Sequence, residues 1–207
     1  LEHFINRQDV VQTILAVAPE DVEEVRRKFG ANLSFMGVKM VEGGAERHET
    51  VAKALEQIKD EAEFVAVHDA VRPCVTEEMI DAVFAQAAKT GAAILAAPVR
   101  ATLKRVGTAN LIENTISREG LWEAQTPQVF RKEWLKEAYA RRSQAGPSIT
   151  DDAQLVEAIG KKVTAVESDL SNLKITVPSD MRLAEAIIKS RPRSKAKGLG
   201  AFEEAQW

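Results

Sequence analysis

Short apolar runs alternate with segments of helical periodicity along most of the chain. We predict strands over residues 12–18, 38–41, 63–67 and 91–99. Helices are predicted over residues 20–28, 47–59 and 76–88. Thr76 is a suitable N-cap for the third helix because two acidic residues follow it in the first turn. The strands are apolar at consecutive positions, which indicates a parallel sheet covered by helices on both faces.

This alternation of strand and helix breaks between residues 100 and 130. Two stretches of alternating apolar and polar residues, 102–106 and 111–116, surround the sequence Gly-Thr-Ala-Asn. Such a pattern is typical of a β-hairpin, and its polar flanks are too weakly hydrophobic for a pair of central strands. We therefore predict a projecting β-hairpin arm over about residues 101–128, lying against a second subunit.

Beyond the arm, the pattern predicts helices over residues 132–142, 151–158 and 179–189, and strands over residues 162–166 and 172–176. Ser179, which follows a proline, is the predicted N-cap of the last helix. After residue 190 the periodicity is lost. We therefore predict an α/β domain over residues 1–190 and a flexible C-terminal tail over residues 191–207.

Composition narrows the class of protein. The 207 residues, 45% hydrophobic and 29% charged, fit one medium globular domain. A net charge of −3 argues against nucleic acid as a partner. No apolar run reaches the roughly 20 residues that span a bilayer, and no signal peptide is visible, so we expect no membrane partner. The single cysteine, Cys74, excludes an internal disulfide.

Candidate chemistry follows the predicted strands, because ligands of open α/β sheets collect at the carboxyl ends of the strands. Asp69 and Arg72 share a short loop after the strand ending at residue 67. The carboxylate can accept a hydrogen bond from a hydroxyl, and the guanidinium can clamp a phosphate. The alternative is an ion pair that merely ties the loop. His68 is interpreted as a hydrogen-bonded loop residue rather than a base.

Two further groups of residues carry candidate chemistry. Gly43 and Gly44 precede a predicted helix and allow the backbone to approach a base or a phosphate, although an ordinary turn has the same pattern. Scattered hydroxyls and cations that suit a phosphorylated polyol are Thr102, Lys104, Arg118, Thr126, Thr150 and Lys174. No metal-ligand spacing, Walker loop or GxGxxG motif is present. Spacing alone predicts an α/β domain that binds a small anionic ligand.

Six segments in order carry a family resemblance over about residues 1–189. They are GGAERHETV from Gly43, VHDAVRP from Val67, APVRATLKR from Ala97, REGLWEAQTPQVF from Arg118, ITDDA from Ile149 and NLKIT from Asn172. The series closely resembles the 2-C-methyl-D-erythritol 4-phosphate cytidylyltransferase family. VHDAVRP together with AQTPQ is the most specific pair.

The resemblance implies a Rossmann-like nucleotidyltransferase domain and a homodimer with interlocking hairpin arms. The implied reaction joins CTP and methylerythritol phosphate to give CDP-methylerythritol and pyrophosphate, a step of isoprenoid precursor synthesis. It implies Mg²⁺ held mainly through the CTP phosphates, with no dedicated protein metal site. It also implies a cytoplasmic bacterial protein, or a plastid protein whose transit peptide has been removed.

The resemblance also implies roles for residues at matching positions. Along the cytidine, with the last near the ribose, it places Gly44, Ala45, Thr50 and Ala70. Facing the sugar phosphate and the reacting phosphates it places Asp69, Arg72, Thr102, Thr150 and Lys174, among which Asp69, Arg72 and Lys174 are the catalytic candidates. Reaching from the arm into the partner's site it places Arg118 and Thr126.

The sequence departs from the family pattern at two points. Ala101 stands where the family usually has an acidic residue. The family also opens with a strand and a Gly-rich loop whose Arg and Lys hold the CTP triphosphate, and nothing here matches that loop. We expect the polypeptide as given to bind CTP poorly for that reason.

Two alternative functions stay open. The ribitol-5-phosphate cytidylyltransferases share the TPQ and ITD-type motifs, although LWEAQTPQ with PVRATLKR favours the methylerythritol group. The other alternative is a non-catalytic binding protein of the same fold.

Overall fold

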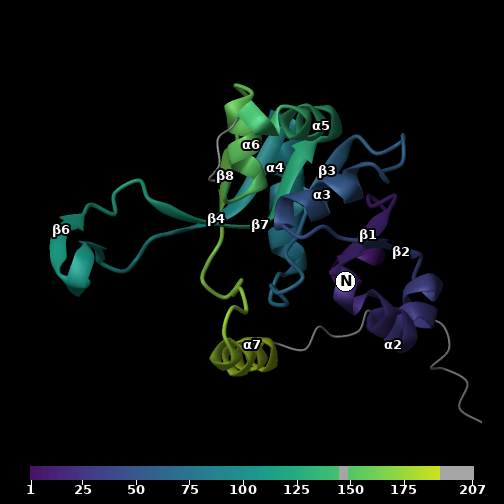
Figure 1. Cartoon of the computed structure of the whole chain (residues 1–207), viewed down its shortest axis with the longest axis horizontal. Helices are drawn as coiled ribbons and strands as arrows, with labels where there is room; N and C mark the ends of the chain where they lie inside the picture. The colour runs from purple at the N-terminus through teal and green to yellow at the C-terminus, as the bar shows by residue number, and fades with distance from the viewer. Residues whose placement is uncertain (145–148, 192–207) are drawn as a thin grey trace, which may run out of the picture.

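The computed structural model describes residues 1–144 and 149–191. A central four-stranded sheet contains β3 (Phe64–Val67), β7 (Trp122–Arg131), β4 (Ala92–Pro98) and β8 (Thr164–Glu167), in that order. A separate parallel pair is formed by β1 (Thr13–Val17) and β2 (Val38–Glu42). Figure 1 shows this pair to one side of the central sheet. The four strands predicted before the arm and the strand predicted over residues 162–166 therefore form, but in two sheets.

Strand β7 corrects two predictions. It runs antiparallel to both of its neighbours, β3 and β4, whereas β4 and β8 are parallel. The sheet is therefore mixed, and the prediction of a parallel sheet was wrong for this strand. Residues 122–128 belong to this strand, so the arm does not extend to residue 128.

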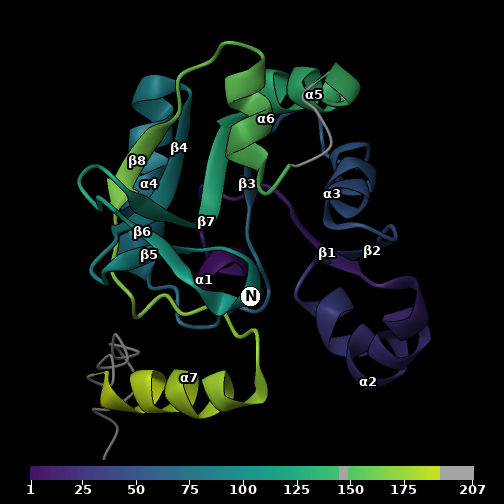
Figure 2. The ribbon, with the colours of Figure 1, turned by 60° about the vertical axis from the view of Figure 1, so that its left-hand side comes forward.

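Helices cover both faces of the central sheet, as predicted (Figure 2). Helix α4 (Glu77–Thr90) packs on one face, where Ile80, Val83 and Ala87 join Leu95 and Val129 in one core cluster. The other face carries α3 (Arg47–Leu55), α5 (Lys132–Ala140) and α6 (Asp152–Ala158). Their core cluster is built from Leu55, Ala92, Phe130, Leu135, Ala138, Ala153, Leu155 and Val156.

The hairpin arm forms as predicted and extends away from the domain (Figure 1). Strands β5 (Leu103–Val106) and β6 (Ile112–Ile116) pair in antiparallel fashion around a short 3₁₀ turn, η2 (Thr108–Asn110). Leu111 and Ile112 are 69% and 63% exposed. The arm therefore presents large apolar side chains outside the core of its own chain.

The helices test the two predicted N-caps. Those not yet described are α1 (Glu2–Ile5), η1 (Pro19–Asp21), α2 (Val22–Phe35), η3 (Arg142–Gln144) and α7 (Pro178–Ser190). The predicted cap Ser179 was wrong, because α7 begins one residue earlier and its N-cap is Val177. The cap Thr76 is confirmed by a 3.2 Å hydrogen bond that its Oγ1 accepts from Met79 N.

The strand predicted over residues 172–176 was also wrong. This segment is a connection, joined to the loop after β3 by a 2.8 Å hydrogen bond from Ile175 N to Val71 O. Nearly all of the predicted C-terminal tail, residues 192–207, lies outside the described residues. Within residues 1–144 and 149–191, no helix is long and apolar enough to cross a membrane.

Gly91 ends helix α4 in the left-handed conformation with φ +88°, and a Cβ atom there would lie 2.4 Å from the Trp134 ring. We expect Gly91→Ala to lower the free energy of unfolding by about 1–2 kcal/mol. Denaturant unfolding measures it. Gly30→Ala is the matched control, because Gly30 lies within α2 and its added Cβ meets Arg26 at an ordinary 3.5 Å. Equal unfolding free energies for Gly91→Ala and the unsubstituted protein would contradict the prediction.

Candidate active site

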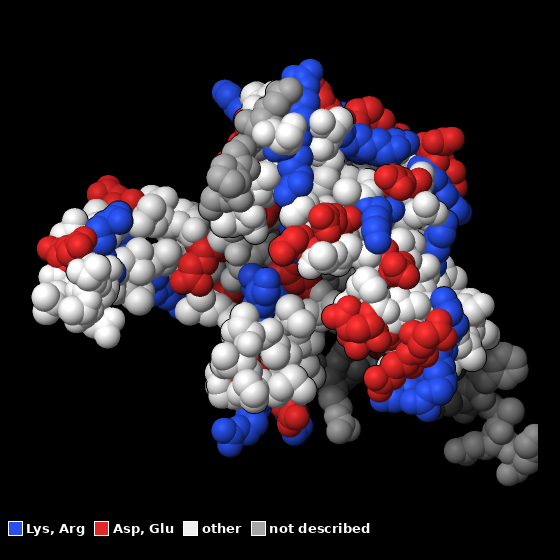
Figure 3. Space-filling model, viewed as in Figure 1, with Lys and Arg blue, Asp and Glu red and all other residues white. Residues whose placement is uncertain are grey.

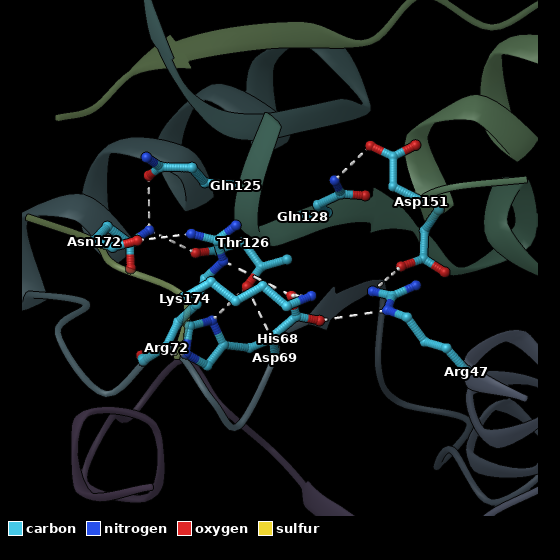
Figure 4. Close-up of polar contacts among 11 residues, drawn as sticks. Arg47, His68, Asp69, Arg72, Gln125, Thr126, Gln128, Asp151, Asn172 and Lys174 are labelled. Carbon is cyan, nitrogen blue, oxygen red and sulfur yellow. Dashed lines mark hydrogen bonds and ion pairs between the residues drawn. The ribbon is translucent and has the colours of Figure 1, made fainter. Parts of the chain in front are cut away.

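A polar pocket of about 110 Å³ lies beside the end of β3 and the middle of β7. Five segments far apart in the chain contribute to it: the start of α3, the loop after β3, strand β7, the start of α6 and the segment before α7. Its lining residues are Arg47, Asp69, Arg72, Ala124, Gln125, Thr126, Gln128, Thr150, Asp151 and Lys174. In Figure 4, Arg47, Arg72 and Lys174 lie around Asp69, whereas Gln128 faces Asp151 and Gln125 faces Asn172.

Three cations surround the carboxylate of Asp69. Lys174 Nζ lies 3.1 Å from Oδ2, Arg47 Nε lies 3.4 Å from Oδ1, and Arg72 Nε lies 3.7 Å from Oδ2. Burial tends to raise the pKa of Asp69, but the hydrogen bond from Lys174 and the charges of Arg47, Lys174 and Arg72 outweigh it, and the pKa is lowered. The carboxylate is therefore ionised at neutral pH and fixes three cations in one place.

Arg72 is held by a buried polar network. Its Nη1 donates a 2.7 Å hydrogen bond to Asn172 O, and its side chain is 11% exposed. Asn172 is fully buried and donates through Nδ2 to Gln125 Oε1 and to Thr126 O, each at 2.9 Å. Arg72 Nε is buried and makes no hydrogen bond to any of the described residues. This Nε is directed at Asp69 Oδ2, 3.7 Å away, and the Arg72 side chain lines the pocket.

His68 fixes the loop that carries Asp69 and Arg72. Its Nε2 lies 3.2 Å from Arg72 O, and its Nδ1 lies 3.1 Å from Thr126 Oγ1. Because a carbonyl accepts only, Nε2 carries the proton and Nδ1 accepts from the threonine hydroxyl. That hydroxyl oxygen in turn accepts from Asp69 N at 3.0 Å. Burial lowers the pKa of His68 to about 4, so the ring is neutral at pH 7, and the interpretation as a hydrogen-bonded loop residue is confirmed.

The opposite wall of the pocket is built from β7 and α6. Gln128 Nε2 donates to Asp151 Oδ2 at 2.9 Å, and its Oε1 accepts from Ala153 N at 3.1 Å. Asp151 is the N-cap of α6 and accepts from Gln154 N at 3.0 Å. These bonds tie the start of α6 to the sheet, and they place Thr150 on the rim of the pocket.

The glycine loop adjoins the pocket without lining it. Gly44 N donates to Thr50 Oγ1 at 3.0 Å, and Ala45 N donates to Glu49 Oε2 at 2.9 Å. A Cβ atom at Gly44 would lie 2.3 Å from Glu49 Cβ, so the close approach of loop and helix requires glycine there. Arg47, two residues beyond Ala45, connects this loop to the pocket.

The structure brings together five of the predicted site residues: Asp69, Arg72, Thr126, Thr150 and Lys174. Thr126 corrects a prediction, because it lies in β7 and lines the pocket of its own chain instead of reaching out from the arm. Thr102 and Arg118 lie outside the pocket, and Arg118 Nη1 donates to Arg100 O. Ala70 follows Asp69 and is exposed.

Sequence reasoning missed several polar residues around the pocket. Asp152 and Asn172 are fully buried, and Gln125 is 4% exposed. No spacing motif marks them, since each is identified by contacts with residues far away in the chain. The one available signal was position: Asp152 follows Asp151 in ITDDA, and Asn172 begins NLKIT.

Charge and metal ligands further define the pocket. On the face seen in Figure 3, acidic and basic side chains are interspersed, so the cations around Asp69 are a local feature. No group of three or more His, Cys, Asp or Glu side chains that could hold a metal ion occurs in the part of the chain that the structure describes. Within the pocket, the cations Arg47, Arg72 and Lys174 gather around the carboxylate of Asp69.

A mixed α/β sheet with a pocket lined by Arg47, Arg72 and Lys174 suits an enzyme that binds nucleotides or sugar phosphates. Two crystal structures of similar fold support this class. The 2-C-methyl-D-erythritol 4-phosphate cytidylyltransferase from Thermus thermophilus superposes with a TM-score of 0.76 at 34% identity, covering 88% of this chain and 84% of that one. The 4-diphosphocytidyl-2C-methyl-D-erythritol synthase from Anaerococcus prevotii gives a TM-score of 0.79 at 26% identity, covering 91% and 83%.

Sequence comparison agrees. The family model IspD, 2-C-methyl-D-erythritol 4-phosphate cytidylyltransferase, matches residues 1–190. A protein of that name from Rhodopirellula baltica is 45% identical over 199 residues, covering 91% of this chain and 80% of the relative. Another from Bacillus pumilus is 40% identical over 176 residues, covering 84% and 76%. The chain therefore belongs to the 2-C-methyl-D-erythritol 4-phosphate cytidylyltransferase family, and the predicted nucleotidyltransferase fold is confirmed.

Proposed function

We propose that the pocket around Asp69 binds 2-C-methyl-D-erythritol 4-phosphate beside CTP and that the protein transfers CMP between them. The products are CDP-methylerythritol and pyrophosphate, in the synthesis of isoprenoid precursors. The observation that carries this proposal is the convergence of Arg47, Arg72 and Lys174 on one carboxylate, within a chain of this family. Cations held in fixed positions are what a phosphate-transfer site requires.

The pocket offers complementary groups for a phosphorylated polyol. Arg72 and Lys174 both line the pocket, and the Lys174 side chain is 42% exposed, so two cations can meet phosphate oxygens there. Asp69 can accept hydrogen bonds from polyol hydroxyls. The hydroxyl of Thr150 on the rim adds a donor and an acceptor.

The chemistry is an in-line displacement. A phosphate oxygen of the polyol attacks the α-phosphorus of CTP, a new P–O bond forms, and the bond to the leaving pyrophosphate breaks. No strong base is needed, because the attacking phosphate is already an anion. The protein's contribution is to hold the two phosphates in line and to neutralise the charge that develops, and Lys174 and Arg72 serve this role.

The cytidine is assigned to the loop of Gly44 and Ala45, to Thr50, and to Ala70 beside the ribose. The loop lies at the N-terminus of α3, and Arg47 in the first turn of that helix connects it to the pocket. Glu49 and Thr50 hold the loop through its backbone N–H groups, which presents a rigid edge to the base.

Nucleotidyltransferases of this kind generally use a divalent metal ion, and Mg²⁺ fits this pocket. Mg²⁺ is commonly held by one or two carboxylates together with substrate phosphates. Because Arg47, Arg72 and Lys174 already surround Asp69, the ion would be held mainly through the CTP phosphates. When bound, Mg²⁺ neutralises charge on the triphosphate.

The proposed assembly is a homodimer through the hairpin arms, in which Arg118, with Thr102 at the base of the arm, serves the partner's pocket. The exposed Leu111 and Ile112 support this proposal, because an interface would bury them. The relatives are bacterial proteins, which favours the bacterial cytoplasm over a plastid as the location.

Substrate choice tests the proposed function. We expect kcat/KM with CTP and methylerythritol phosphate to exceed that with ribitol 5-phosphate by at least about tenfold, because a site that pairs its polar groups with one polyol penalises another. Release of pyrophosphate measures both reactions. Equal or better use of ribitol 5-phosphate would assign the protein to the ribitol group. Binding of both substrates without any product would make it a binding protein.

A further inference from the structure

A buried polar cluster lies behind the pocket, among α3, α5 and α6. Asp152, the first residue of α6, is fully buried. Its Oδ1 accepts a 2.5 Å hydrogen bond from Tyr139 Oη, and its Oδ2 accepts a 2.8 Å hydrogen bond from Arg47 Nη2. Asp152 and Tyr139 do not line the pocket.

Arg47 joins this cluster to the pocket. Its Nη2 contacts the buried Asp152, while its Nε faces Asp69 Oδ1 at 3.4 Å. Burial opposes the charge of Arg47, yet attraction to Asp152 and the hydrogen bond between them outweigh it, so the pKa of Arg47 is raised. Because the guanidinium is planar and rigid, a bond that fixes Nη2 also fixes the direction of Nε. The position of Asp152 therefore sets how Arg47 meets Asp69.

We propose that Tyr139 and Asp152 are positioning residues for cytidylyl transfer, acting through Arg47 on Asp69. Tyr139 holds the carboxylate of Asp152, Asp152 holds the guanidinium of Arg47, and Arg47 holds one oxygen of Asp69. This inference rests on the proposed function, because it assigns Asp69 to substrate binding.

The alternative is that the cluster only ties three helices together. Two features favour positioning. The side chain of Arg47 is 38% exposed at the pocket, and such a long side chain loses its orientation when its partner is removed. Arg47 also begins α3, directly after the glycine loop assigned to cytidine. One guanidinium thus connects the two proposed substrate sites.

The test uses two isosteric substitutions, Tyr139→Phe and Asp152→Asn, with steady-state kinetics and calorimetric binding of methylerythritol phosphate. We expect kcat/KM to fall about threefold to fivefold for Tyr139→Phe and about tenfold to thirtyfold for Asp152→Asn. Arg141→Gln is the control, because Arg141 ends α5 in an exposed pair with Glu137 at 2.9 Å. We expect the kinetics of the control to be unchanged.

A double-mutant cycle separates positioning from a structural role. In an Arg47→Gln background, Tyr139→Phe and Asp152→Asn should have no further effect on kcat/KM, although each still lowers stability in denaturant unfolding. Losses in kcat/KM that add to that of Arg47→Gln would overturn the inference. Unchanged kcat/KM in a folded Tyr139→Phe protein would also overturn it, and this variant decides the matter where Asp152→Asn does not fold.

Different measurements test the proposed function and the positioning role of Tyr139 and Asp152. An unsubstituted protein that binds CTP and methylerythritol phosphate yet makes no CDP-methylerythritol refutes the proposed function. The same cycle read by calorimetry needs no turnover and still decides whether Tyr139 and Asp152 act on substrate binding through Arg47.

Discussion

Lys174→Met is expected to lower kcat by about 10²–10³-fold while the protein stays folded. Lys174 Nζ lies 3.1 Å from Asp69 Oδ2 and lines the pocket beside Arg72. In the proposed reaction its charge faces the phosphate oxygens on which negative charge develops. Methionine keeps the length of the side chain and removes that charge, so the loss falls mainly on the transition state. Steady-state kinetics with CTP and methylerythritol phosphate measure it.

The free energy of unfolding shows whether Lys174→Met lowers kcat by a loss of catalysis or by a loss of folded protein. The side chain of Lys174 is nearly half exposed, and a pair of this kind contributes under about 1 kcal/mol after solvent screening. We therefore expect a small change in the free energy of unfolding. Lys189→Met is the matched control, because Lys189 lies on α7 in an exposed pair with Glu185. A kcat within about threefold of the unsubstituted protein would remove Lys174 from the catalytic groups.

The order of most elements was predictable because β1, β3 and β4 are apolar runs and the helices have an apolar face. Ile80, Val83 and Ala87 recur at helical spacing, and all three lie on the buried face of α4. Thr76 was found in the same way, because capping depends on local hydrogen bonds. Helical spacing and helix capping depend on residues close together in the chain, so the sequence alone predicts them.

Strand β7 could not be predicted because three of its buried residues are polar and a fourth is a proline. Gln125, Thr126 and Gln128 are each at most 4% exposed, and hydrogen bonds to distant residues make their burial possible. Pro127 argues against a central strand. The pairing of β7 with β4 passes from Gln128 to Ala124 across an irregularity, and the proline lies in that gap, where it interrupts no ladder bond.

The candidate site also contains residues that the sequence predicts and residues that it does not. Asp69 and Arg72 could be predicted because they follow a recognisable strand, and ligands collect at strand ends. From spacing alone the partners of these residues could not be predicted, and of these partners the family resemblance placed only Lys174 with them. Arg47 and Asp152 are separated by 105 residues, as are Asp69 and Lys174, and Arg72 and Asn172 by 100. Such pairs exist through tertiary packing, which one sequence does not display.

Arg118→Ala is expected to reduce turnover by the equivalent of about 2–3 kcal/mol of lost charge-assisted phosphate binding, with folding intact. Arg118 lies at the base of the arm, where it contacts Arg100 O, and it does not line the pocket of its own chain. In the proposed homodimer it reaches the partner's pocket instead. Kinetics measure the loss, and gel filtration with light scattering shows whether the dimer persists.

Mixing two inactive proteins tests this arrangement directly. In a dimer of one Arg118→Ala chain and one Asp69→Ala chain, one pocket has both defects and the other has neither. Equal mixing makes about half of the dimers hybrid, so about a quarter of the unsubstituted activity should return. Mixing Asp69→Ala with Lys174→Met is the control, since both residues line one pocket of one chain and no intact pocket forms. Absence of recovery, with subunit exchange demonstrated by native mass spectrometry, would place Arg118 in the site of its own subunit.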